Sequence, residues 1–187
     1  MARFDFDTQK AIHTTLYILS KLGGEADYHK IFKILYFAEQ KHLVKYGRPV
    51  TSDEYQAMQF GPVPSFIYDI FKAVERGSAP FFEAKEYQNY FKVSRYGNAP
   101  FVIALIKPDL DQLSESEIEV LDSSISENKD LTFKQLVDKS HDDAWDAASA
   151  QADIEMPYVE IARAAGADPD MLKYILLHIE NDSSQLQ

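Results

Sequence analysis

One apolar helix between two clear breaks constrains the fold of this chain most. Residues 29–46, HKIFKILYFAEQKHLVKY, follow Asp27, which can cap a helix, and end before Gly47 and Pro49, which stop one. Apolar side chains occupy most of the circumference of this helix, which predicts that it lies buried at the centre of the protein. Its polar side is predicted to gather Lys30, Lys33, Lys41 and Lys45.

Other segments also carry helical spacing, and one region favours strands. The apolar stripes predict a helix over 11–22, one from about Ser65 to Gly77, and helices capped by Ser114 with Glu117, by Thr132 and by Asp168. The stripe after Thr132 continues to Ala147, and the last helix is expected to bury Leu172, Ile175, Leu176 and Ile179. Residues 90–95 and 100–106 are predicted to form a β-hairpin with a longer loop, and residues 54–60 a short strand or extended loop.

These patterns predict one mainly α domain. We expect a single compact helical domain of about six to eight helices with a small antiparallel β-hairpin or sheet. The chain has 187 residues, which suits one domain better than two. We assign residues 1–180 to the domain and expect residues 181–187 to be a disordered tail.

Charge is distributed unevenly along the chain. The net charge is -11, with 14 basic and 11 acidic residues in 1–108 but 5 basic and 19 acidic residues in 109–187. Such an acidic half disfavours direct nucleic-acid binding and would attract a basic protein partner, although a solvated surface has the same composition. There is no cysteine, no secretory leader and no membrane-length apolar run. We therefore expect a cytoplasmic protein that makes no membrane contact.

Motifs for catalysis are missing from the sequence. No glycine-rich phosphate loop, no GxSxG elbow and no HExxH motif occurs. Residues 141–143, HDD, contain possible metal ligands, but neighbouring residues of a helix point about 100° apart and cannot face one ion together. We expect no catalytic residue, no cofactor and no metal, and hence no enzyme.

Glu39 and His42 form a candidate polar pair on the buried side of the central helix. An unpaired buried carboxylate costs several kcal/mol, so Glu39 needs hydrogen-bond donors. One interpretation is an acid/base pair for catalysis. The other, which we favour, is structural: the two side chains tie the irregular segments 47–50, GRPV, and 61–64, GPVP, to the helix.

Residues 31–68 resemble the Panacea domain of the SocA-like antitoxin family. The resemblance rests on the runs ILYFAE (34–39), YGRP (46–49), YQAM (55–58) and GPVP (61–64), together with His42 and Tyr68. A weaker second block comprises Leu113-Ser114, Glu117, Ser140-His141 and Ala144-Trp145, and Leu16–Leu19 also fits. Two residues depart from the family pattern: Glu39 replaces a shorter aspartate, and Ser52 stands where glycine is frequent.

The resemblance implies an antitoxin, or a phage-associated relative, that neutralises a cognate toxin by direct protein binding, without catalysis or a cofactor. Aromatic residues around the irregular loop are the candidate interface, with acids that steer a basic toxin. The candidates are Tyr55, Gln59, Phe60, Val63, Tyr68, Asp142, Asp143 and Asp146. An adaptor that delivers a bound protein to a protease or another regulator is the alternative, and an enzyme using Glu39 and His42 is a third hypothesis. The oligomeric state is left open.

Overall fold

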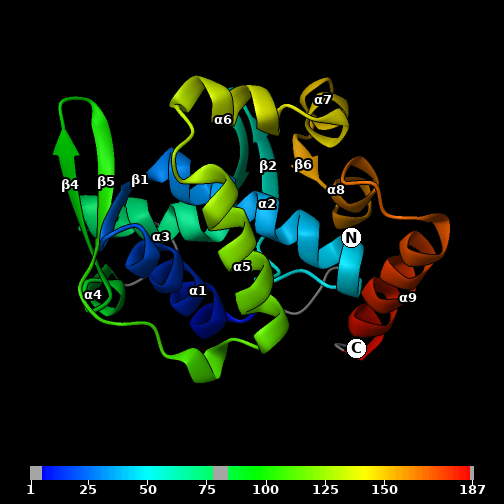
Figure 1. Ribbon diagram of the computed structural model, residues 1–187, viewed down its shortest axis with the longest axis horizontal. Coiled ribbons are helices and arrows are strands. Elements are labelled where there is room, and N and C mark those ends of the chain that lie inside the picture. Colours follow the sequence, from blue (N-terminus) through cyan, green and yellow to red (C-terminus); the bar gives the residue numbers. More distant parts are fainter. Residues whose placement is uncertain (1–5, 78–83, 186–187) are drawn as a thin grey trace.

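Helix α2 (Tyr28–Tyr46) runs through the middle of the protein, as its apolar circumference predicts (Figure 1). The computed structural model describes residues 6–77 and 84–185. Within these ranges the fold is mainly helical, with nine α-helices and two small antiparallel sheets, one helix more than the upper number expected. The predicted fold class is confirmed.

The other helices surround α2. Helix α1 (Thr8–Lys21) and helix α5 (Glu115–Asn128) pack along it, and α6 (Phe133–Ser140) and α8 (Tyr158–Ala164) also contact it. Helix α3 (Ser65–Arg76) is strongly amphipathic, and its apolar face packs against the core. The remaining helical segments are α4 (Ala84–Tyr87), the 3-10 turn Leu110–Gln112, α7 (Asp143–Ser149) and α9 (Pro169–Gln185).

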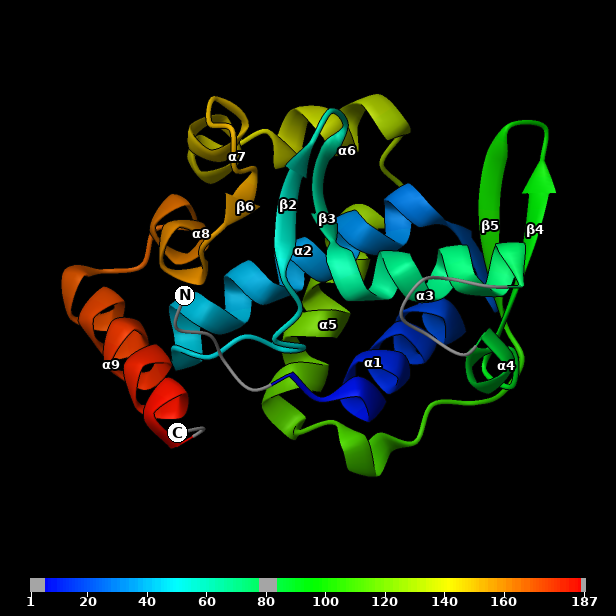
Figure 2. The ribbon, with the colours of Figure 1, turned by 180° about the vertical axis from the view of Figure 1, so that it is seen from behind.

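Each sheet has three short strands. The first has the order β1 (Glu25–Asp27), β5 (Ala99–Ala104), β4 (Phe91–Tyr96), and the second has the order β3 (Gly61–Pro64), β2 (Tyr55–Met58), β6 (Glu155–Met156). The β4–β5 and β2–β3 hairpins point the same way on one side of the molecule, with α6 beside the β2–β3 turn (Figure 2). They form two ridges on that side.

Local signals set most helix ends as predicted. The Asp27 side chain accepts from the Lys30 amide at the start of α2, and Gly47 ends that helix with φ 67°. Ser114 and Glu117 form the predicted capping box of α5, and Thr132 caps α6. These caps link residues three apart, so they are readable from the sequence alone.

Several predictions about local structure are wrong. The loop between β4 and β5 is a two-residue turn, because Tyr96 pairs with Ala99. The helix that starts after Thr132 ends at Ser140, since Asp142 caps a separate helix α7. Leu176 on α9 is 45% exposed rather than buried.

Helix α9 extends to Gln185, since no glycine or proline after Pro169 stops it, and the assignment of residues 1–180 to the domain with a tail at 181–187 stays a prediction. Residues 186–187 lie outside the described residues. Lys33 is fully buried instead of lying on a lysine-rich polar side, because its ammonium is turned to the Pro62 carbonyl of β3. In the described ranges no helix is both long and apolar enough to cross a membrane.

Candidate protein-binding site

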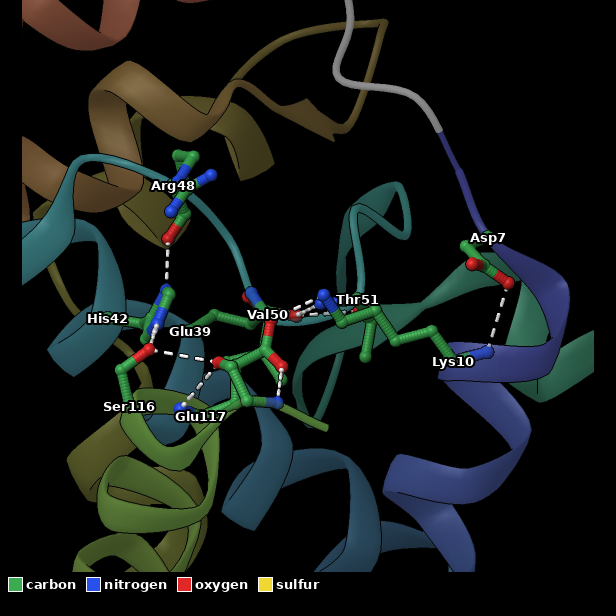
Figure 3. A network of polar contacts seen from close by, with 10 residues as sticks. Asp7, Lys10, Glu39, His42, Arg48, Val50, Thr51, Ser116 and Glu117 are labelled. Atoms are coloured by element: carbon green, nitrogen blue, oxygen red, sulfur yellow. Dashed lines mark hydrogen bonds and ion pairs between the residues drawn. The ribbon is translucent and has the colours of Figure 1, made fainter. Parts of the chain in front are cut away.

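The Glu39 carboxylate holds the segment that follows α2. It accepts hydrogen bonds from the Val50 amide, from the Thr51 amide at 3.0 Å and from the Thr51 hydroxyl at 2.6 Å (Figure 3). Burial raises the pKa of the Glu39 carboxyl to about 7, and these three hydrogen bonds act in the opposite direction. All three donors belong to residues 50 and 51, so the Glu39 carboxylate fixes this segment against α2.

His42, one turn further along α2, holds the same segment at another point. Its Nδ1 lies 2.6 Å from the Arg48 carbonyl oxygen and its Nε2 lies 3.1 Å from the Ser116 hydroxyl (Figure 3). A carbonyl only accepts, so Nδ1 carries the proton and Nε2 accepts from Ser116. Burial lowers the pKa of His42, which favours this neutral form. Glu39 and His42 thus bind residues 48–51 and each uses different partners.

Lys33 holds the 61–64 segment, and Asp53 holds the start of α3 directly after it. The Lys33 ammonium donates to the Pro62 carbonyl at 2.7 Å. The Asp53 carboxylate accepts from the Phe66 and Ile67 amides at 2.9 and 3.0 Å, which caps α3 from outside the helix. Burial raises the pKa of Asp53 to about 7 and lowers that of Lys33 to about 7. These contacts give the β2–β3 hairpin a fixed position against α2 and α3.

An apolar cavity of about 840 Å³ lies between the two hairpins, and we call it the hairpin groove. Its floor is the first part of α2, its sides are the β2–β3 turn and the start of α6, and its end is the tip of the β4–β5 hairpin. The residues that define it are residues 27–30, Phe32, Lys33, Met58, Gln59, Phe60, Val63, Tyr68, residues 98–101, residues 131–133 and Leu136.

Two aromatic side chains stand exposed on the rim of the hairpin groove. Phe60 and Phe133 are each 52% exposed, and their ring centroids lie 5.5 Å apart in an edge-on contact. The His29 ring lies 4.2 Å from Phe133, and one of its nitrogens binds the Phe60 carbonyl at 3.1 Å. Exposed aromatic rings on a preformed apolar groove are typical of a protein-binding surface.

Four of the predicted interface residues line this groove. Gln59, Phe60, Val63 and Tyr68 come together there from β2–β3 and α3. Tyr55 does not: it is 1% exposed, because alternate residues of β2 face inward and its ring packs against Tyr36. We therefore leave Tyr55 out of the candidate surface.

The three predicted acids lie outside the groove, at the start of α7. Asp142 is half-buried, caps α7 and accepts from the Tyr36 hydroxyl and the Gln40 amide, both at 2.7 Å. Asp143 and Asp146 are exposed. The Trp145 indole donates to the Met58 carbonyl at 2.9 Å, which places α7 against the far side of the β2–β3 turn. In the part of the chain that the structure describes, no cluster of histidine and acidic residues could hold a metal ion.

Comparison with known proteins shows that this chain matches one protein family. The family described as antitoxin SocA-like, Panacea domain, matches residues 31–146. The chain belongs to this family. The match extends from α2 through α3 and α5 to Asp146, and so contains both sides of the hairpin groove. No curated protein and no solved structure matches the chain.

Sequence reasoning about this SocA-like chain missed several functional positions. Lys33, Asp53 and Phe133 were not singled out. The apolar circumference of α2 could have indicated that Lys33 is buried. Phe133 directly follows the Thr132 cap, and no local signal marks it as exposed. Nothing local marks Asp53 as a cap, because its partners lie thirteen and fourteen residues away.

Proposed function

We propose that this protein is an antitoxin that neutralises its cognate toxin by direct protein–protein binding at the hairpin groove. The observation that carries the proposal is the apolar groove with Phe60 and Phe133 exposed at its rim, inside the part of the chain that matches the antitoxin family. Gln59, Val63 and Tyr68 complete the proposed surface. Binding by complementary shape needs no catalytic group and no cofactor.

The buried polar contacts support this function by preorganising the groove. Lys33 and Asp53 fix the two ends of the β2–β3 segment, so the Phe60 turn is presented on a rigid support. A rigid surface loses less conformational entropy on binding. Asp143 and Asp146, exposed on α7, would raise the association rate of a basic toxin.

Coexpression with the toxin tests the proposal. The gene beside the one for this chain is expressed with it in a heterologous host, and growth and complex formation are measured. Wild-type protein should restore growth and copurify with the toxin. The double variant Phe60→Ala/Phe133→Ala should lose both, whereas Leu110→Ala, which truncates a side chain 51% exposed on the 3-10 turn, should lose neither. No rescue by the wild type would contradict the antitoxin function.

An adaptor function is the second candidate, and one observation favours it. Helix α9 exposes Tyr174, Leu176 and Leu177, at 44, 45 and 58%. An adaptor needs a second docking surface, and this apolar face is separate from the groove. If it delivers the toxin to a protease, the half-life of the toxin falls when this chain is present, and Leu177→Ser lengthens it again without loss of toxin binding. An unchanged half-life would argue for sequestration alone.

A further inference from the structure

One lysine of α2, Lys30, brings to the lining of the hairpin groove an ammonium that has no carboxylate partner among the described residues. The Lys30 ammonium donates to the carbonyls of Lys129 and Leu131 at 2.5 and 3.2 Å, and the Lys33 ammonium donates to the Pro62 carbonyl. Among residues 6–77 and 84–185, no ion pair joins either ammonium to a carboxylate. The acid in the groove lining, Asp27, accepts from the Lys30 backbone amide as the cap of α2.

This local charge is opposite in sign to the net charge of the protein, which is -11. Around Lys30 the groove lining is mostly aromatic and aliphatic, and in such surroundings a charge interacts more strongly than in bulk water. Two acids on the neighbouring helices α3 and α6 are paired with lysines of the same helix: Asp69 with Lys72 at 2.6 Å and Asp138 with Lys134 at 2.5 Å. A carboxylate that enters the groove would therefore gain a partner, and a cation would be repelled.

We propose that the hairpin groove binds a partner segment in which apolar side chains flank an aspartate or a glutamate, with the carboxylate at Lys30. Lys30 is half-exposed and can make this contact. Lys33 is fully buried behind it and makes no contact with the partner. Phe60 and Phe133 contact the apolar side chains. The identity of the partner as a toxin rests on the proposed function; the chemistry of the segment rests on the groove.

A peptide selection tests the proposal without knowledge of the toxin. Random 12-residue peptides displayed on phage are selected against the full chain. The consensus peptide is synthesised with a fluorescein label, together with analogues in which its acid is replaced by the amide or by lysine. Fluorescence polarisation gives the affinities. The acidic peptide should bind at least about tenfold tighter than the lysine analogue, and its affinity should fall as salt is added.

Variants assign the binding to the groove. Lys30→Gln should weaken the acidic peptide about tenfold and the amide analogue less than about threefold, since only the former loses a charge-assisted contact. Phe133→Ala should weaken both peptides. Lys173→Gln, which changes a lysine 76% exposed on α9, is the matched control and should change neither. Circular dichroism melting curves confirm that each variant is folded.

Three results would overturn the proposal: selection of basic or uncharged peptides, selection of no peptide, or displacement of the peptide by dodecanoate at the same Lys30-dependent site. The last would assign the groove to a small amphipathic acid. Growth rescue separates this inference from the proposed function. Rescue that survives Lys30→Gln and Phe133→Ala leaves the antitoxin function standing but removes the groove as its site. Binding of the acidic peptide without growth rescue by the wild type would leave the groove specificity standing and contradict the antitoxin function.

Discussion

The Lys33 ammonium and the Pro62 carbonyl lie 2.7 Å apart, where helix α2 supports the β2–β3 hairpin. A residue of the central helix thus holds, through its side chain, the strand that follows the Phe60 turn. Gly61 makes this approach possible, because a side chain there would collide with the lysine. The groove wall depends on this contact between segments 29 residues apart.

Lys33→Met should remove a rise in stability at alkaline pH. Burial lowers the pKa of Lys33 to about 7 in the folded protein, from an ordinary value of 10.5. Between these pH values Lys33 is protonated in the unfolded chain but not in the folded protein. The free energy of unfolding of the wild type therefore increases as pH rises. His29 and His141 beside it stay neutral there, because burial lowers the pKa of both.

Urea unfolding of wild type and Lys33→Met at pH 7, 8.5 and 10 measures this effect. The stability difference between the two proteins should shift in favour of the wild type as pH rises. Lys134→Met, at a side chain that is 82% exposed, is the control and should run parallel to the wild type. If the free energy of unfolding of Lys33→Met also changed with pH as that of the wild type does, Lys33 would not lose its proton in the folded protein over this pH range.

Glu39→Gln should destabilise the protein, and more at pH 5 than at pH 8. The amide cannot accept with both ends, so a buried backbone amide loses its partner at a cost of about 1–3 kcal/mol. The pKa of Glu39 is raised to about 7 from 4.5, so the folded protein binds the extra proton between these values and wild-type stability falls as pH rises through them. Chemical denaturation at both pH values should show this, with Glu119→Gln on the surface as the control. An equal loss at both pH values would refute the shift.

Asp53→Ala should cost about 2–4 kcal/mol, because it leaves two amides at the start of α3 without an acceptor. Helix α3 starts after Pro64, which offers no side-chain cap of its own. Asp53→Asn keeps one acceptor oxygen and should lose about half as much. Thermal melting with calorimetry checks the order. Equal losses for the two variants would show that charge, rather than capping, matters.

Gly61→Ala should destabilise far more than Gly97→Ala. Both glycines have positive φ, 97° and 64°, which costs an L-residue about 1–2 kcal/mol. A Cβ at Gly61 would also collide with Ser140 Oγ and lie 2.8 Å from Lys33 Cε, whereas no atom lies within 4 Å at Gly97. Denaturation midpoints of the two variants measure the difference. Similar midpoints would mean that the hairpin shifts freely away from α2.

Ser52→Gly should stabilise the protein by about 0.5–1 kcal/mol. Ser52 has φ 59°, the left-handed region that favours glycine, directly after the Val50 and Thr51 contacts with Glu39. Glycine removes the backbone strain, and part of the gain is lost to the greater freedom of the unfolded chain. Ser52→Ala keeps the strain and is the control. A lower melting temperature for Ser52→Gly would show that the serine side chain matters more than its backbone.

The sequence determined most of the helices and several of their ends. Caps at Asp27, Ser114 and Thr132 join residues three apart, and a stripe of apolar residues persists over several turns, so both signals are local. The burial of Glu39 followed from the same periodicity. The resemblance in residues 31–68 pointed to the antitoxin family before any contact was known.

Only the tertiary structure decided the sheets and the hairpin groove. Strand β1 pairs Ala26 with Val102, and β6 pairs Met156 with Tyr55. Strands of two or three residues are too short to show an alternation, and their hydrogen bonds join residues far apart in the chain. The groove likewise combines α2, two hairpins and α6, which no local pattern brings together.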